Sequence, residues 1–452
     1  MIAEHPARGA SALTLFAAPW AAALLFHVGA GNLWRAAWLD AGVALLLLLR
    51  PASTLALVAF ALVQVVATVP LTPNTGNHAL LMALVNVGLL VTASTLAVQR
   101  RTLRIDRDAL SAAFAPAARV SLLAFYFFTV FHKLNTDWFD PASSCGPAFS
   151  AAMHRRFPFL PDLPLLHTAA IYHTLVVEAA IPLLLVFRRS RRLGVLVGVL
   201  FHGVIALNPI SGFYNFSAVV VALLSLFVDP SLVRDAARWL GARRLTMAAW
   251  TAALGFIVVA VNAVWRPDVG VTPTSGALAL WVVYWMAVLA LFVGAWQRRP
   301  PPATTSAPFA LPLGVAAVMP LLVIVNGAMP YLGLKTESAW AMYSNLTTEG
   351  GRSNHWIVPA RWQPFGYQRD LVQITSASHP VLHTVARRAQ SIPYFELRRR
   401  PDAAVTYVRD GVEHRVDRIA DDPAFTGPVP RWLGAVLLFR PVTPDGTQSC
   451  RH

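Results

Sequence analysis

Residues 120–140 read VSLLAFYFFTVFHKLNTDWFD, and this stretch decides the class of fold. Residues 120–134 form a mostly apolar run that we expect to cross a membrane. Lys133 is the second-to-last residue of this run. The chain has two lysines among its 37 basic residues, so an amine here is unusual. Arginine stays protonated, whereas a poorly solvated lysine can lose its proton and act as a base. An ionisable group at membrane depth therefore indicates a functional site, unless Lys133 merely snorkels to the headgroups.

The composition predicts a polytopic membrane protein. Hydrophobic residues make up 56% of the chain and charged residues 13%, about half the charged share of soluble domains. The net charge of +15 does not indicate a nucleic-acid partner, because the arginines lie mostly in short loops between apolar runs and in a polar C-terminal tail. We expect an all-α membrane bundle with a small extracytoplasmic α+β C-terminal domain, in a bacterial inner membrane.

Apolar runs along the chain predict about ten or eleven transmembrane helices. The second run is short for a crossing. The runs are residues 13–28, 36–49, 54–69, 79–98, 120–134, 165–187, 193–207, 213–228, 245–264, 277–296 and 309–332.

Charge asymmetry predicts the orientation of this bundle. If the spans alternate, four arginine-rich loops fall on one side, which the positive-inside rule makes cytoplasmic. The N-terminus is then cytoplasmic, and the tail after residue 332 is periplasmic or extracellular. The loops contain Arg100, Arg101, Arg104 and Arg107; Arg188, Arg189, Arg191 and Arg192; Arg234, Arg238, Arg243 and Arg244; and Arg298 and Arg299.

The chain divides into four expected regions: N-terminal membrane segments (1–53), a core of spans (54–230), additional helices (231–332) and the tail domain (333–452). Short strands are expected in the tail at residues 357–359, 371–374, 405–408 and 435–439, with one helix at 383–395. Asp410–Gly411 in TYVRDGVEHRV marks a hairpin turn. Cys145 and Cys450 both fall outside the cytoplasm, where a disulfide between them can persist; two free thiols are the alternative.

Several polar groups are expected at one membrane level. Their burial is costly unless they pair or line a wet cavity, so we expect a polar cavity open to the outer face. Each histidine taken alone could instead be hydrogen-bonded to a neighbouring helix. No metal site is expected, because the histidines are too scattered and no HExxH or paired CxxC occurs. The groups are His78, His132, Lys133, Asn135, Asp137, His173, Glu178 and His202.

Several segments resemble one known family. FHKLNTDWFD (residues 131–140) resembles the lysine-bearing motif of the vitamin K-dependent γ-glutamyl carboxylases. GNHALLMALVNVG (76–88) resembles the segment that carries an active-site histidine in that family. The helix pair FRRSRRLGVLVGVLFH and FYNFSAVVVALLSLFVDP is also similar, and the wider pattern is that of the horizontally transferred transmembrane (HTTM) domain. AWAMYSNLTTEGGRSNHW (339–356) resembles a segment of bacterial HTTM proteins.

The resemblance implies a lyase-type chemistry. Lys133 would be the base that takes a proton from a reduced quinone, and His78 would donate a hydrogen bond to developing charge. Glu178 would orient a neighbour. The implied quinone is menaquinol or vitamin K hydroquinone from the lipid, with O₂ and CO₂ as co-substrates and a secreted peptide or protein as a possible partner.

Two functions of different classes follow. The first is a carboxylase-like or epoxidase-like membrane enzyme that uses a reduced quinone. The alternative is a non-catalytic membrane binding or transport protein that retains the HTTM fold.

Overall fold

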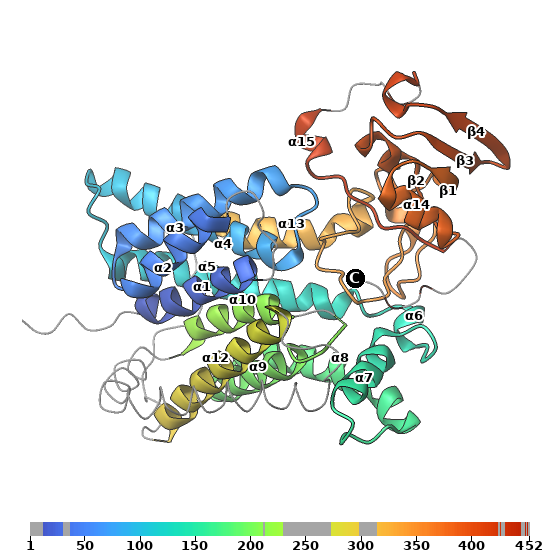
Figure 1. Ribbon diagram of the computed structural model, residues 1–452. Helices are drawn as coiled ribbons and strands as arrows, with labels where there is room; N and C mark the ends of the chain where they lie inside the picture. The colour runs from blue at the N-terminus through green and yellow to red at the C-terminus, as the bar shows by residue number, and fades with distance from the viewer. Residues whose placement is uncertain are drawn as a thin grey trace, which may run out of the picture.

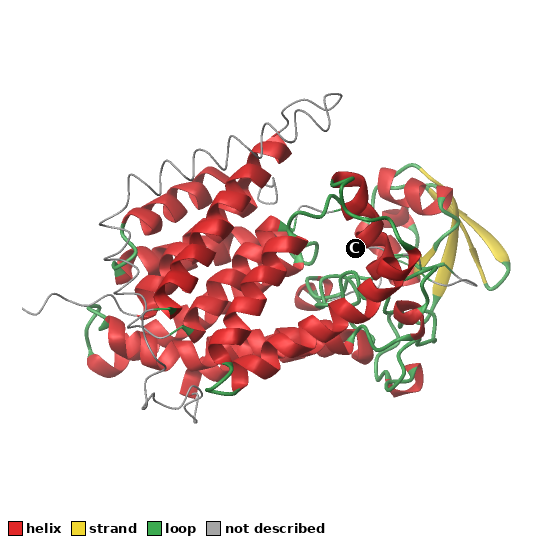
Figure 2. Cartoon of the chain, turned by 90° about the horizontal axis from the view of Figure 1, so that it is seen from below, coloured by secondary structure: helices red, strands yellow, loops and turns green. Residues whose placement is uncertain are grey.

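The computed structural model describes residues 12–29, 37–210, 213–228, 273–297, 314–423, 425, 430–443, 448 and 450. The expected span at 245–264 lies outside these residues. The helices form one bundle, and a small sheet domain lies beyond one end of it (Figure 1). The view turned by 90° separates the helical bundle from the strands in the same way (Figure 2). The expected fold class, a helical membrane bundle with an α+β tail, is confirmed.

Six described helices are long and apolar enough to cross a membrane, which identifies a multi-span membrane protein. Among the described residues, three shorter apolar helices and one with arginines in its first turn also belong to the bundle. The six are α3 with its 3₁₀ extension η1 (Thr54–Thr68, Val69–Leu71), α4 (Asn77–Arg100), α5 (Arg107–Phe131), α8 (Pro164–Val186), α12 (Pro273–Trp296) and η3 with α13 (Gly314–Ala317, Val318–Leu332). The others are α1 (Ala12–Gly29), α2 (Ala37–Leu49), α9 (Arg191–Ile205) and α10 with η2 (Tyr214–Leu224, Ser225–Phe227).

Helix α5, which leads to Lys133, is longer than the apolar run that predicted it. It begins at Arg107, because the Asp106 carboxylate accepts a hydrogen bond from the Asp108 amide at 2.9 Å and caps the helix. Glycine lets α13 approach closely, because a Cβ at Gly327 would clash with the Phe128 ring of α5. Helix α13 therefore packs directly on α5, and both end on the same side of the bundle, here called the tail end.

The tail contains a four-stranded antiparallel sheet in the order β2-β1-β3-β4. The strands are β1 (Leu371–Ala377), β2 (Ser391–Pro393), β3 (Val405–Arg409) and β4 (Val412–Val416), and helix α14 (Pro380–Arg387) packs on β1. The expected turn at Asp410–Gly411 is confirmed, and both residues have positive φ as a two-residue hairpin requires. The sheet and α14 enclose a hydrophobic core separate from that of the bundle.

Three expected tail elements are wrong. Residues 357–359 are not a strand, and within 435–439 only Leu438 forms an isolated bridge, to Lys335. The helix expected at 383–395 is instead α14, Pro380–Arg387, which starts earlier and is shorter.

Helix α14 starts at Pro380 because the His379 ring accepts the Val381 amide and the φ of proline is already helical. It ends before Ala389, which has a φ of 48°. The chain then pairs as β2 with β1.

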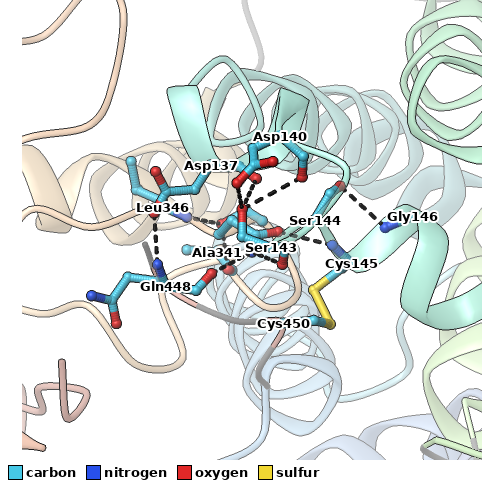
Figure 3. The surroundings of a disulfide bond; sticks show 12 residues. Asp137, Asp140, Ser143, Ser144, Cys145, Gly146, Ala341, Leu346, Gln448 and Cys450 are labelled. Carbon is cyan, nitrogen blue, oxygen red and sulfur yellow. Dashed lines mark hydrogen bonds between the residues drawn. A yellow bond between two sulfur atoms is a disulfide. The ribbon is translucent and has the colours of Figure 1, made fainter. Parts of the chain in front are cut away.

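A disulfide joins Cys145, the first residue of α7 (Cys145–Arg156), to Cys450 near the end of the chain (Figure 3). The expected bond is therefore present. The side chain of Asn345 reinforces it: its Nδ2 donates to the carbonyls of Ser143 at 2.8 Å and Gln448 at 3.0 Å, and its Oδ1 accepts from the Cys145 amide. Gln448 and Cys450 are thereby held against the start of α7.

Candidate functional site

Lys133 lies just past the end of α5, with its side chain turned inward. Its Nζ donates to Glu178 Oε2 of α8 at 2.7 Å and to the Thr129 carbonyl at 3.1 Å. The two ionisable side chains are only 6% and 14% exposed. The amine also lies 5.3 Å from the centre of the Trp138 ring. Lys133 therefore forms a buried ion pair, and its amine does not extend to the headgroups as snorkelling would require.

The local sequence explains this placement. Helix α5 ends at Phe131, and Asn135 starts the short helix α6 (Thr136–Phe139) by accepting a hydrogen bond from the Trp138 amide at 2.9 Å. The same Asn135 donates from Nδ2 to the carbonyls of His132 and Ser344, both at 2.7 Å. The chain thus turns sharply after Lys133, and the turn places Trp138 beside the amine.

Lys133 and Glu178 lie on the wall of a cavity of about 440 Å³. Its walls come mainly from α7, α8 and α9, and most of the lining is apolar. Three lining side chains, His173, Leu200 and Val204, are also exposed at the surface of the bundle, so they mark its rim. The remaining polar lining side chains are Thr129, Ser150, Thr174, Asn208 and Tyr343.

This arrangement can move a proton. An ammonium and a carboxylate in an apolar surrounding lose most of their hydration, so an ion pair there has little advantage over a neutral amine and a neutral acid. The 2.7 Å contact between Lys133 Nζ and Glu178 Oε2 is within the range for direct proton transfer. A neutral amine facing an apolar cavity is a base for any weakly acidic group that binds beside it.

His78 lies elsewhere among the described residues. Its ring centre is 4.6 Å from that of His27 in α1, and its Nε2 is 3.2 Å from Asn215 Nδ2 in α10. It is not among the described side chains that line the Lys133 cavity. Of the polar residues expected to share one cavity, Lys133, His173 and Glu178 lie on the same cavity wall. His78 instead contacts His27 and Asn215.

The other expected residues connect elements of the structure. His132 donates from Nε2 to the Ala339 carbonyl at 3.0 Å, and its Nδ1 is 2.8 Å from the Tyr331 hydroxyl. Asp137 accepts the Gln448 amide at 2.9 Å. His202 and the Tyr126 hydroxyl are hydrogen-bonded at 2.7 Å inside the bundle.

Sequence reasoning did not single out Trp138, His27 or Lys335. The signal for Lys335 was available, since it is the second of two lysines. It lies just beyond the last span, is buried, and donates to Asn326 Oδ1 at 3.2 Å. Burial lowers the pKa of Lys335 to about 8. His27 contacts His78, which is distant in the sequence, and Trp138 lies beside Lys133 because of the turn after α5.

No protein-family model matches the chain, and neither a curated protein nor a solved structure matches it. The described residues identify a helical protein with six candidate membrane spans, and they identify no family.

Proposed function

We propose that this protein is a membrane-embedded enzyme that takes a reduced quinone from the lipid, with Lys133 as its base. The observation that carries the proposal is the Lys133–Glu178 pair on the wall of an apolar cavity. The likeness of residues 131–140 to the lysine motif of the vitamin K-dependent carboxylases supports the same assignment.

The cavity suits an aromatic diol. Its volume is within the range of small-molecule sites, about 300–1,000 Å³, and its lining is mainly apolar with the amine and carboxylate at one place. The ring system would lie against apolar side chains such as Phe149 and Phe201, and a hydroxyl would face Lys133.

In the proposed step, Lys133 transfers its proton to Glu178 and the resulting amine accepts a proton from the bound hydroxyl. The net result moves one proton to Glu178 and leaves the negative charge on the substrate oxygen, facing the Lys133 ammonium. A reduced quinone has such an acidic hydroxyl. In the carboxylases, oxidation of the reduced quinone by O₂ accompanies the addition of CO₂ to a peptide glutamate. His78 carries no step in this proposal.

The test uses purified protein in lipid nanodiscs with reduced menaquinone, O₂ and labelled bicarbonate. We expect mass spectrometry to detect an oxygenated quinone product, and labelled carboxylate on a glutamate-rich peptide if carboxylation follows. Discs without protein are the control for autoxidation. Binding of the quinone without any product above that control would contradict the enzyme and support the non-catalytic membrane binding protein.

We also propose that the tail end of the bundle faces away from the cytoplasm. Disulfides persist in oxidising compartments, and Cys145–Cys450 lies at this end. Arg100 and Arg107 lie at the opposite end, where α4 ends and α5 begins, as the positive-inside rule requires of the cytoplasmic side. A cysteine introduced at exposed Val412 in β4 should react with a membrane-impermeant maleimide in intact cells. Reaction only after the cells are opened would reverse the orientation.

A further inference from the structure

Residues 351–369, here called the interfacial loop, combine exposed apolar and basic side chains. Trp356, Ile357, Trp362 and Phe365 are exposed, and Trp362 is 59% exposed. Arg352, Arg361 and Arg369 are exposed as well. No acidic residue occurs between Glu349 and Asp370. Exposure of tryptophan side chains to water is unfavourable. Tryptophan and arginine side chains are both favourable at the boundary between the lipid headgroups and the acyl chains.

The interfacial loop is fixed at the level where two spans end. The Trp356 amide donates to the Leu134 carbonyl just past α5 at 3.0 Å. The Phe365 amide donates to the Leu332 carbonyl at the end of α13 at 3.2 Å. The loop thus runs between the ends of α5 and α13, and Figure 1 shows the orange segment after α13 lying between the bundle and the sheet. Backbone hydrogen bonds therefore hold its exposed side chains at the level where the candidate spans α5 and α13 end.

The aromatic side chains continue from this loop around the bundle. The Trp356 ring stacks on Phe139 of α6, with centres 4.5 Å apart, and Phe139 lies 5.9 Å from Tyr172 of α8. Tyr172 is exposed, as is Val176 one turn further along α8. The interfacial loop is therefore continuous with the exposed apolar surface of the candidate span α8.

We propose that the interfacial loop is a membrane-binding surface that holds the tail against the headgroup region of the bilayer, with a preference for anionic lipids. Its aromatic side chains provide the insertion into the boundary region, and its arginines provide the electrostatic attraction to negative headgroups.

The test measures the depth of spin labels. The native cysteines are paired, so single cysteines at Trp362 or Ile357 can be labelled selectively, with Val412→Cys as the matched control. Val412 is 58% exposed in β4, outside the loop, and Ile357 is 54% exposed within it. The label at Ile357 leaves both loop tryptophans in place. The protein is placed at one copy per nanodisc, so that no second copy can cover the loop.

In discs containing phosphatidylglycerol, the labels at positions 357 and 362 should show a several-fold higher ratio of oxygen to nickel-complex accessibility than the label at 412. Discs of phosphatidylcholine alone should reduce that difference. Equal ratios at all three positions in anionic discs would place the loop in water and overturn the proposal. If the difference between the loop labels and the label at 412 is as large in phosphatidylcholine discs, the loop has no preference for anionic lipid.

Discussion

Lys133→Arg should abolish turnover of the reduced quinone while leaving the protein folded. Arginine can keep the ion pair with Glu178, so the contact between α5 and α8 should survive. A guanidinium cannot release its proton at ordinary pH, so the base is lost. The expected fall in rate is about 10²–10⁴-fold, as for other general bases. The measurement is quinone oxygenation by wild type and variant in matched nanodiscs, with the melting temperature as the check on folding.

A chemical rescue separates proton transfer from charge at this position. Lys133→Cys can be modified with an aminoethyl reagent, which restores a titratable amine, or with a trimethylammonium-ethyl reagent, which supplies only a fixed charge. The native cysteines do not compete, because they are paired. We expect the first modification to restore activity and the second to leave the protein inactive. Equal rescue by both, or full activity in Lys133→Arg, would show that Lys133 is not the base.

Removal of the disulfide should strongly destabilise the protein. Cys145 and Cys450 are separated by 305 residues, and cross-links that close long loops give the larger stabilisations in the chain-entropy account. We expect Cys450→Ala to lower the free energy of unfolding by about 2–4 kcal/mol. The melting temperature and the rate of proteolysis at the tail measure the change.

The control for this prediction is reduction of the wild type. Dithiothreitol should lower the melting temperature of the wild type to that of Cys450→Ala and have no effect on the variant. The effect should extend to the cavity, because α7 starts at Cys145 and supplies Gly146, Phe149 and Met153 to its wall. A wild type whose stability is insensitive to reduction would contradict a structural role for the bond.

The expected membrane spans agree closely with the described helices, because the signal for a span is local. Most residues of α4 and α8 are apolar, so composition over about 20 residues is sufficient to predict these helices. The tail was harder to predict for the opposite reason. Strand β2 is only Ser391–Pro393, and its partners are Leu371–Gln373 in β1, so no local pattern distinguished it from the end of a helix.

The sequence by itself determined the membrane class and most of the spans, and it singled out Lys133 in FHKLNTDWFD as a candidate. It also placed Glu178 and His173 near that lysine, since alternating spans put all three at one depth. Only the tertiary structure decided which groups touch. Glu178 meets Lys133 although 45 residues separate them, whereas His78 faces His27 and Asn215. Depth in the membrane follows from hydropathy along the chain, but the partner of a side chain depends on which helix faces pack together.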